Sequence, residues 1–442
     1  AKSLTEQDHS ITVIDQSSED IQKINESLDV KAIVGKATLP TILEKANTSE
    51  ADMIIAVTRN DEINMLICQI AYSIFKVPKT IARIRSQDYL DPKFSTLYNK
   101  ENLPIDVIIS PEFEIAKSIQ RKLESPGSLD NVPFADNKIR LLEIFIDKNC
   151  PISNTKLNDL TKKFPKLNAN ILGVVRDENF IFLKKSDVMK FNDKAYVVIN
   201  ASQMNETLKA FGHNEKISSK ILIIGGGNIG LHLAKNIENT FEDARLKIIE
   251  KNKERAEFLA NELSNTIVIN GNGLDEDILA EVNLEDVETV IALTNDDEDN
   301  LMVSVIVEKF SKNKRTMALT NKPNYSLLQS SLKIDDLIDP RKTTVSSILK
   351  HIHKGTIENA YTILNGDYEV IEAEIIETSE LINKQLKESN LPSEIKIGAI
   401  LRDDQVIIPR SNFIFKKNDS VVLLAKKDQL QTVESMFRLS SV

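Results

Sequence analysis

The chain has 442 residues, 41% of them hydrophobic, which is enough for several domains that each bury a core. Its formal net charge of -10 argues against a nucleic-acid surface, because such a surface needs clustered Lys and Arg side chains. Two cysteines provide no disulfide framework and fit a reducing compartment, and the longest stretch without a charged side chain, residues 221–234, is too short to span a membrane.

The first part of the chain predicts alternating strands and helices. Short apolar runs indicate the strands, and apolar side chains at helical spacing indicate the helices between them. The expected strands are 12–14, 32–34, 53–57 and 80–83, and the expected helices are 19–27 and 63–75. Because parallel strands need long crossover connections, this alternation favours a parallel sheet.

The same pattern then occurs a second time, since residues 54–64 reappear as residues 290–300. The second copy predicts strands at 220–224, 246–249, 267–269, 289–293 and 317–320, with helices at 229–239, 252–264, 276–282 and 299–310. Its opening strand and glycine-rich turn, residues 220–230, have no counterpart in the first copy. The repeat therefore predicts that the chain is truncated at its N-terminus and that the first copy lacks a strand and a glycine loop.

Each copy continues with a helical segment that starts at a proline, a residue suited to the first helical position, and then with a β-rich segment. The helical segments are 111–123 and 340–353, and the strands expected after them are 139–146, 171–175, 180–183 and 196–199 in the first copy and 369–376, 396–401, 405–408 and 420–424 in the second.

The predicted fold class is therefore α/β, with two tandem Rossmann-like, doubly wound parallel-sheet domains, each followed by a small α+β domain. The expected segments are 1–110 (first sheet, without its first strand and glycine loop), 111–136 (crossover helix and linker), 137–213 (first small domain), 218–339 (second, complete sheet), 340–366 (crossover helix and linker) and 367–442 (second small domain).

The strongest local motif is Gly225-x-Gly227-x-x-Gly230, between a predicted strand and a predicted helix. An acidic residue, Glu250, ends the next strand about 20 residues later, as the dinucleotide fingerprint requires. We expect Gly225 to permit a tight turn, Gly227 to let the backbone approach a pyrophosphate, and Gly230 to let helix and strand pack closely.

The helix begins at Asn228 and Ile229, where free N–H groups and a partial positive charge face the phosphates. Glu250 can accept hydrogen bonds from both ribose hydroxyls, and its charge would repel a 2′-phosphate, which favours NAD-type or adenosine ligands over NADP. The alternative is a glycine turn that packs but binds nothing, and the complete sequence context favours a binding site.

Two further loops are expected at the same crevice, because ligands of parallel sheets lie beyond the C-terminal strand ends. Asn272 and Gly273 can touch an adenine, although a simple turn is an equal alternative. Thr294, in the repeated phrase, is expected to contact the ligand or to pack against the glycine loop. A divalent-cation site is one interpretation of the acidic cluster 296–299, but a solvated helix N-terminus with favourable acids is the preferred one.

In the first copy, Asp15 takes the position of the fingerprint acid and Thr58 that of the threonine in the repeated phrase. Arg83 and Arg85 end a strand on one face and are candidates for binding phosphate oxygens, with ion pairs to nearby acids as the alternative. Without a glycine loop, this first site lacks a phosphate cradle.

No residue is expected to be catalytic or to bind a metal. The side chains of His351 and His353 point apart on a helix, which makes a poor metal site. Cys68 lies on an apolar helix and is expected to be buried, whereas Cys150 precedes a proline and is expected to be exposed. Neither cysteine has a nearby histidine that would make it a nucleophile.

The duplicated phrase, the glycine loop with its distant acid, the Asn-Gly-Asn-Gly turn at 270–273 and the trailing small domains together resemble the TrkA-type regulatory proteins of Trk potassium uptake systems. That family carries two tandem RCK (KTN) units, each with a Rossmann-like N-lobe and a small C-lobe. The resemblance implies NAD(H), ATP or ADP as ligands, held by Gly225, Gly227, Gly230, Glu250 and Asn272 in the second copy and by Asp15, Arg83 and Arg85 in the first.

The resemblance also implies a peripheral subunit on the cytoplasmic face of the plasma membrane, without a transmembrane segment. Such a subunit forms a homo-oligomer, expected as a tetrameric ring, on a Trk-type membrane potassium transporter whose gating the nucleotide shifts. The alternatives are an NAD-dependent oxidoreductase and an RCK regulator of another channel or exchanger. An oxidoreductase needs an acid–base residue beside the nicotinamide, and the strand regions of the small domains hold no histidine.

Overall fold

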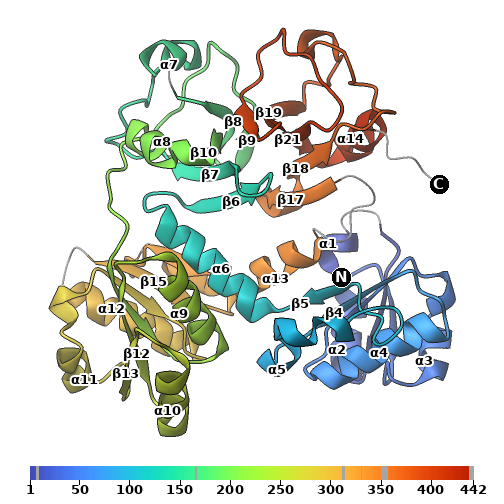
Figure 1. The fold of residues 1–442 in the computed structure, drawn as a ribbon, viewed down its shortest axis with the longest axis vertical. Helices are drawn as coiled ribbons and strands as arrows, with labels where there is room; N and C mark the ends of the chain where they lie inside the picture. Colours follow the sequence, from blue (N-terminus) through green and yellow to red (C-terminus); the bar gives the residue numbers. More distant parts are fainter. Residues whose placement is uncertain (6–8, 165–166, 311–313, 330, 350–356, 438–442) are drawn as a thin grey trace. The chain divides into compact units, whose positions relative to one another are not determined.

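The structure is a computed structural model that describes residues 1–5, 9–164, 167–310, 314–329, 331–349 and 357–437 (Figure 1). The chain divides into two compact units, Ala1–Glu114 and Ile115–Val442. Within the described ranges, no helix combines the length and the apolar character that crossing a membrane requires.

The first unit carries the first copy of the parallel sheet in two pieces. One piece pairs β1 (Thr12–Asp15) with β2 (Lys31–Val34), and the other joins β3 (Met53–Ala56), β4 (Lys79–Arg83) and β5 (Val107–Ile109). The helices of this unit are α1 (Lys2–Thr5), α2 (Ser18–Ser27), α3 (Pro40–Lys45), α4 (Asp61–Ser73) and α5 (Gln87–Leu90).

The second unit contains the complete sheet, with six parallel strands in the order β13-β12-β11-β14-β15-β16. The strands are β11 (Lys220–Ile224), β12 (Arg245–Glu250), β13 (Ile267–Asn270), β14 (Thr289–Ala292), β15 (Arg315–Leu319) and β16 (Asp336–Ile338). β11 lies between β12 and β14, whose counterparts β1 and β3 belong to separate sheets in the first unit. The first copy is thus divided at the position of the strand that the repeat predicted to be missing.

This sheet is buried on both faces, as expected for a doubly wound domain. Along β11, Ile221 and Ile223 enter one hydrophobic core, while Leu222 and Ile224 enter another on the opposite face. The surrounding helices are α9 (Asn228–Thr240), α10 (Lys253–Glu262), α11 (Glu276–Glu281) and α12 (Asp297–Phe310). The Rossmann-like prediction for the second copy is confirmed.

Each copy ends in a five-stranded antiparallel sheet, in the order β6-β7-β10-β8-β9 or β17-β18-β21-β19-β20. The first has β6 (Asp130–Phe134), β7 (Ile139–Phe145), β8 (Ala169–Arg176), β9 (Asn179–Ile181) and β10 (Lys194–Asn200), with helices α7 (Leu157–Lys163) and α8 (Met204–Ala210). The second has β17 (Ile357–Ile363), β18 (Tyr368–Glu374), β19 (Ile395–Arg402), β20 (Gln405–Ile407) and β21 (Ser420–Lys426), with helix α14 (Leu430–Phe437).

The edge strands β6 and β17 were not predicted from the sequence, because they fall in segments expected to be helix and linker. β6 contains Pro133, which weakens a strand pattern but is tolerated at the edge of a sheet. Each edge strand pairs along most of its length with the next strand of its own sheet, β7 or β18. In structural terms both strands therefore belong to the small domains.

The two small domains share one hydrophobic core. Side chains from both sheets meet there, including Leu172, Val198, Val370 and Val422. Polar contacts reinforce this junction, since the Asn170 side-chain amide donates to the carbonyls of residues 397 and 398 at 3.0 and 3.1 Å. The two C-terminal sheets consequently form one body within the second unit.

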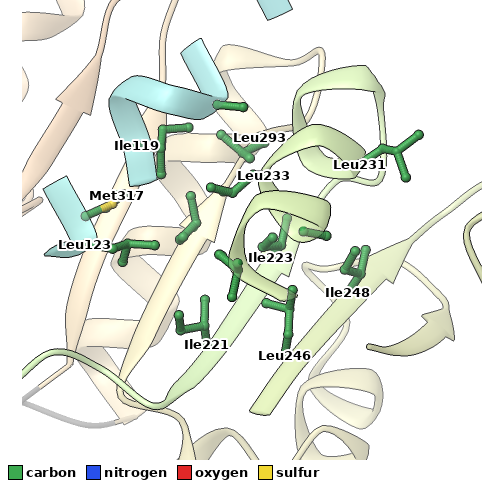
Figure 2. Close-up of a cluster of buried hydrophobic side chains, with 14 of the residues drawn as sticks. Ile119, Leu123, Ile221, Ile223, Leu231, Leu233, Leu246, Ile248, Leu293 and Met317 are labelled. Carbon is green, nitrogen blue, oxygen red and sulfur yellow. The ribbon is translucent and has the colours of Figure 1, made fainter. Parts of the chain in front are cut away.

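Helix α6 (Pro111–Glu124) covers the sheet of the opposite copy. Beyond residue 114 its apolar side chains enter the core of the second Rossmann-like domain, where Figure 2 shows Ile119 and Leu123 beside Leu233 and Met317. A buried ion network fixes its end, because the Asp336 carboxylate accepts from Lys122 Nζ at 2.9 Å and from Arg315 Nη2 at 2.7 Å. The second crossover helix is α13 (Pro340–Leu349).

Candidate functional site

The glycine loop between β11 and α9 turns tightly, as the motif predicts. Gly225 has a φ of +106°, a left-handed conformation that side chains disfavour. A Cβ atom at this position would lie 2.8 Å from the backbone of Leu293 and of Thr294. The loop after β14 therefore packs directly on the glycine loop, which was one of the two roles expected for the repeated phrase.

The other two motif glycines have different environments. A Cβ atom at Gly230 would lie 2.3 Å from the Gly225 carbonyl oxygen, so the close approach of helix and turn depends on this glycine. A Cβ atom at Gly227 would meet no atom within 4 Å. The space above Gly227 is therefore open, and a ligand rather than the protein would be excluded by a side chain there.

The open space lies at the N-terminus of α9. The helical hydrogen-bond ladder begins with the Leu231 N–H, which donates to the Gly227 carbonyl at 3.0 Å. The N–H groups before it, including those of Asn228 and Ile229, have no acceptor within the helix and carry the positive end of its dipole. Asn228 is exposed and Ile229 is half-buried. This arrangement suits phosphate oxygens.

Glu250 ends β12 beside this loop. One carboxylate oxygen accepts from the Gly226 N–H at 2.7 Å, and the other accepts from the Asn252 N–H at 2.8 Å. Each oxygen retains acceptor capacity for a further hydrogen bond. The side chain is thus fixed beside the glycine loop with lone pairs available for sugar hydroxyls.

Arg255, near the start of α10, was not singled out from the sequence. Its Nε donates to the Gly226 carbonyl at 2.8 Å, and its Nη2 donates to the Asn228 Oδ1 at 3.3 Å. The guanidinium also lies over the Phe258 ring, 4.8 Å from its centroid. The sequence signal was weak, because this arginine is one of many charges on an exposed helix.

Asn272 and Gly273 follow β13, at the same edge of the sheet. Asn272 is exposed, and its Oδ1 accepts from the Leu274 N–H at 3.2 Å, as in a turn. A Cβ atom at Gly273 would lie 2.3 Å from Ile224 Cγ2, so this glycine is required for packing against the end of β11.

The repeated segment, residues 54–64 and 290–300, forms the same hydrogen-bond network in both copies. The Asn300 Oδ1 accepts from the Thr294 N–H at 2.8 Å and from its hydroxyl at 2.7 Å. The Asn64 Oδ1 accepts from the Thr58 N–H and hydroxyl at the same two distances. The side-chain amide of each asparagine then donates to a carbonyl at the end of the neighbouring strand. Asn300 donates to the Leu319 carbonyl at 3.0 Å, and Asn64 donates to the Arg83 carbonyl at 2.8 Å. The repetition therefore preserves the shape of a loop.

The acidic cluster 296–299 has protein partners of its own. The buried Asp297 carboxylate accepts from the N–H groups of Asn321 and Lys322, at 2.9 and 3.0 Å. A hydrogen bond from Lys322 lowers the pKa of the exposed Glu298 to about 2. Among the described residues, no group of three or more potential ligands could hold a metal ion. The helix N-terminus interpretation fits these contacts.

In the first copy, Asp15 ends β1, and its carboxylate accepts from the Ser17 N–H at 2.8 Å. Arg83 and Arg85 both approach Glu112, with nitrogen–oxygen distances of 3.9 and 3.5 Å. Burial, and secondarily the Arg85 charge, lowers the pKa of Arg83. The two arginines thus share one face as expected, and the ion-pair alternative describes their present contacts.

Neither cysteine is exposed. Cys68 is buried as expected, but Cys150 is also buried, with 6% of its surface accessible, which contradicts the prediction of exposure. Its side chain enters the core of the first small domain with Leu208 and Phe211. His351 and His353 lie outside the described residues.

Comparison with known proteins agrees with this architecture. The TrkA-N domain family matches residues 1–111 and 221–340, and the TrkA-C domain family matches residues 141–212 and 370–438. The chain is 38% identical over 440 residues to the Trk system potassium uptake protein TrkA of Azorhizobium caulinodans, and 32% identical over 444 residues to that of Vibrio alginolyticus. Both alignments cover 100% of this chain and 96% of the relative.

Solved structures share the fold at low sequence identity. The GsuK RCK domain aligns with a TM-score of 0.59 and 16% identity, over 99% of this chain and 91% of that one. The GsuK channel bound to NAD aligns with the same TM-score, 0.59, and the same identity, 16%, over 99% of this chain and 76% of that one. The predicted fold class, two tandem Rossmann-like domains each with a small C-terminal domain, is confirmed. With identity above 30% along its whole length, the chain belongs to the TrkA family of Trk system potassium uptake proteins.

Proposed function

We propose that this chain is the nucleotide-binding regulatory subunit of a Trk-type potassium uptake system. One observation carries the proposal: an open space above Gly227, at the N-terminus of α9, with the Glu250 carboxylate fixed beside it. Helix N–H groups suit a diphosphate, and the carboxylate suits ribose hydroxyls. The relatives' name, potassium uptake protein TrkA, supplies the transport process.

The ligand we propose is NAD(H), with ATP or ADP as further candidates. All three share the adenosine and diphosphate groups that this crevice would recognise. Contacts are proposed with Gly225, Gly227, Asn228, Ile229, Gly230, Glu250, Asn272, Gly273 and Thr294 in the second copy, and with Asp15, Thr58, Arg83 and Arg85 in the first. A solved structure that shares this fold, the GsuK channel, binds NAD, which supports this choice of ligand.

The proposed partner is a membrane potassium transporter subunit of the Trk type, on the cytoplasmic face of the plasma membrane. We further propose a homo-oligomeric ring of four chains. For each chain we propose the domain division 1–110, 111–136, 137–213, 218–339, 340–366 and 367–442. Because β6 and β17 pair within the small sheets, the two linker segments contribute a strand each to the small domains.

Regulation in this proposal requires no covalent chemistry. A nucleotide that binds one conformation of the assembly better than another shifts the population by no more than its differential affinity. The alternative of an NAD-dependent oxidoreductase would need an acid–base group at the nicotinamide position. Turnover of candidate alcohols or hydroxy acids with NAD would support that alternative.

The first test is thermal unfolding of the full chain with and without NADH or ADP. A ligand that binds only the folded state should raise the midpoint as its concentration increases. Gly227→Val should abolish this increase and lower the midpoint without ligand only modestly, because a Cβ atom at this N-cap position meets no protein atom within 4 Å. A wild-type chain that shows no shift at millimolar nucleotide would refute nucleotide binding.

The second test reconstitutes a Trk-type transporter in liposomes and measures potassium flux. Addition of the wild-type chain should make the flux depend on NADH or ADP. Gly227→Val should associate with the transporter and give a flux that no longer responds to nucleotide. A flux that responds equally with both proteins would show that regulation does not pass through this site.

A further inference from the structure

We infer that Arg255 is a phosphate-binding and positioning residue of the nucleotide site in the second copy. This inference rests on the proposed function and adds a residue that neither the glycine fingerprint nor its acid identifies. In this structure the guanidinium donates to two neutral acceptors of the glycine loop, the Gly226 carbonyl at 2.8 Å and the Asn228 Oδ1 at 3.3 Å.

The charge of Arg255 is not matched by an acid. Among the described residues, no carboxylate forms an ion pair with it, although Lys253 on the same helix lies 4.0 Å from Glu257. Its remaining contact is the face of the Phe258 ring. A guanidinium that is hydrogen-bonded only to neutral groups can still form charge-assisted hydrogen bonds with an anion that arrives beside it.

The position of this charge follows from the contacts. Arg255 touches Gly226 and Asn228, which flank Gly227 on both sides, and Gly227 borders the open space. A diphosphate that binds to the N–H groups of α9 would therefore lie within reach of the arginine side chain. The planar fork can exchange the Asn228 oxygen for a phosphate oxygen while Nε keeps its bond to the loop.

Arg255 and Glu250 would then bind different parts of the ligand, the phosphates and the ribose respectively. Glu250 holds the loop through the Gly226 N–H and would accept from the ribose hydroxyls, and its charge would repel a phosphate placed there. Arg255 adds positive charge only where the phosphates lie. Affinity should therefore rise with the number of phosphates on a 5′-adenosine ligand, and Arg255 should provide part of that increase.

Isothermal titration of the full chain with adenosine, AMP and ADP tests the inference. Arg255→Gln should weaken ADP binding about 10- to 100-fold and leave adenosine binding within about twofold of wild type. The ADP affinity of Arg255→Lys, which keeps the charge but loses the planar fork, should lie between the affinities of wild type and Arg255→Gln. Lys253→Gln is the matched control, because it removes an exposed positive charge from the same turn of α10, and it should change ADP binding little.

The outcomes separate this inference from the proposed function. Equal loss of adenosine and ADP binding in Arg255→Gln would mean that the arginine only shapes the loop, and unchanged ADP binding would mean that it does not reach the phosphates. Either result overturns the inference while the nucleotide site stands. Failure of the wild-type chain to bind any of the three ligands would overturn the proposed site and the role of Arg255 together.

Discussion

The Arg176 guanidinium holds the fully buried Asp193 carboxylate through two hydrogen bonds, of 2.7 and 2.6 Å. In the second copy Arg402 holds the fully buried Asp419 in the same way, with two bonds of 2.6 Å. Each aspartate also accepts from a backbone N–H three residues earlier in the chain. The hydrogen bond to the aspartate raises the pKa of each arginine. The ion pair ties the end of one strand to the turn before another in both small domains.

Asp419→Ala should destabilise the second small domain by about 3–5 kcal/mol, because it leaves the Arg402 charge without its partner. Amide hydrogen exchange in β21 under increasing denaturant measures this loss. The double variant Arg402→Met/Asp419→Leu should recover much of the stability, since apolar replacement of both partners removes the unpaired charge. Equal stability of Asp419→Ala and wild type would show that the pair contributes nothing.

Asn300→Ala should lower the free energy of unfolding by about 2–3 kcal/mol and loosen the loop after β14. The substitution leaves the Thr294 N–H and the Leu319 carbonyl without their buried partner. Faster hydrogen exchange at the Thr294 N–H reports the loosening, and nucleotide binding should weaken with it. Asn295→Ala, at an exposed position of the same loop, is the control and should leave exchange at Thr294 unchanged.

Gly230→Ala and Gly227→Ala should differ sharply in their effects. At residue 230 the new methyl group would lie 2.3 Å from a backbone oxygen, so we expect a loss of about 2 kcal/mol or more in the free energy of unfolding. At residue 227 it enters open space, so the loss should stay below about 1 kcal/mol. Denaturant titration without ligand compares the two, and similar losses would contradict the geometry described for the loop.

Lys396 should make the stability of the joined small domains rise with pH. Its Nζ donates to the carbonyls of Ile171 and Leu172, at 2.7 and 3.2 Å, and burial lowers the pKa of this lysine to about 8. Between pH 8 and the ordinary lysine range near 10.5, the unfolded chain binds more protons than the folded chain, so unfolding becomes less favourable as pH increases.

Between about pH 8 and 10, the free energy of unfolding of the wild type should therefore rise by about 1–2 kcal/mol relative to that of Lys396→Met. Thermal midpoints of both proteins across this range provide the measurement. Lys384→Met removes an exposed lysine from the same domain and should follow the wild-type profile. Parallel profiles for wild type and Lys396→Met would refute a shifted titration of this side chain.

Sequence reasoning was most successful where the pattern is local. The alternation along residues 220–230 predicted a strand, a tight turn and a helix, and the environments of Gly225 and Gly230 match the roles expected for them. Arg176 and Arg402 each form the same ion pair in the two small domains, with an aspartate 17 residues away. The sequence did not reveal these pairs, because folding of the strands determines the contact.

Features that depend on edges and on tertiary packing were missed. β5 and β16 have three residues each, too few to show a period, and β6 includes a proline. Cys150 was expected to be exposed because it precedes a proline, yet the surrounding core covers it. Arg255 resembled any surface charge until the turn before α10 placed it against the glycine loop.

The packing of α6 means that a half-length product would not be a self-sufficient protein. Cleavage between the repeats would leave Ile119 and Leu123 facing water and would open the hydrophobic layer that they close on the later half. A single copy would therefore need a second molecule to cover that helix, whereas one continuous chain supplies the cover from within.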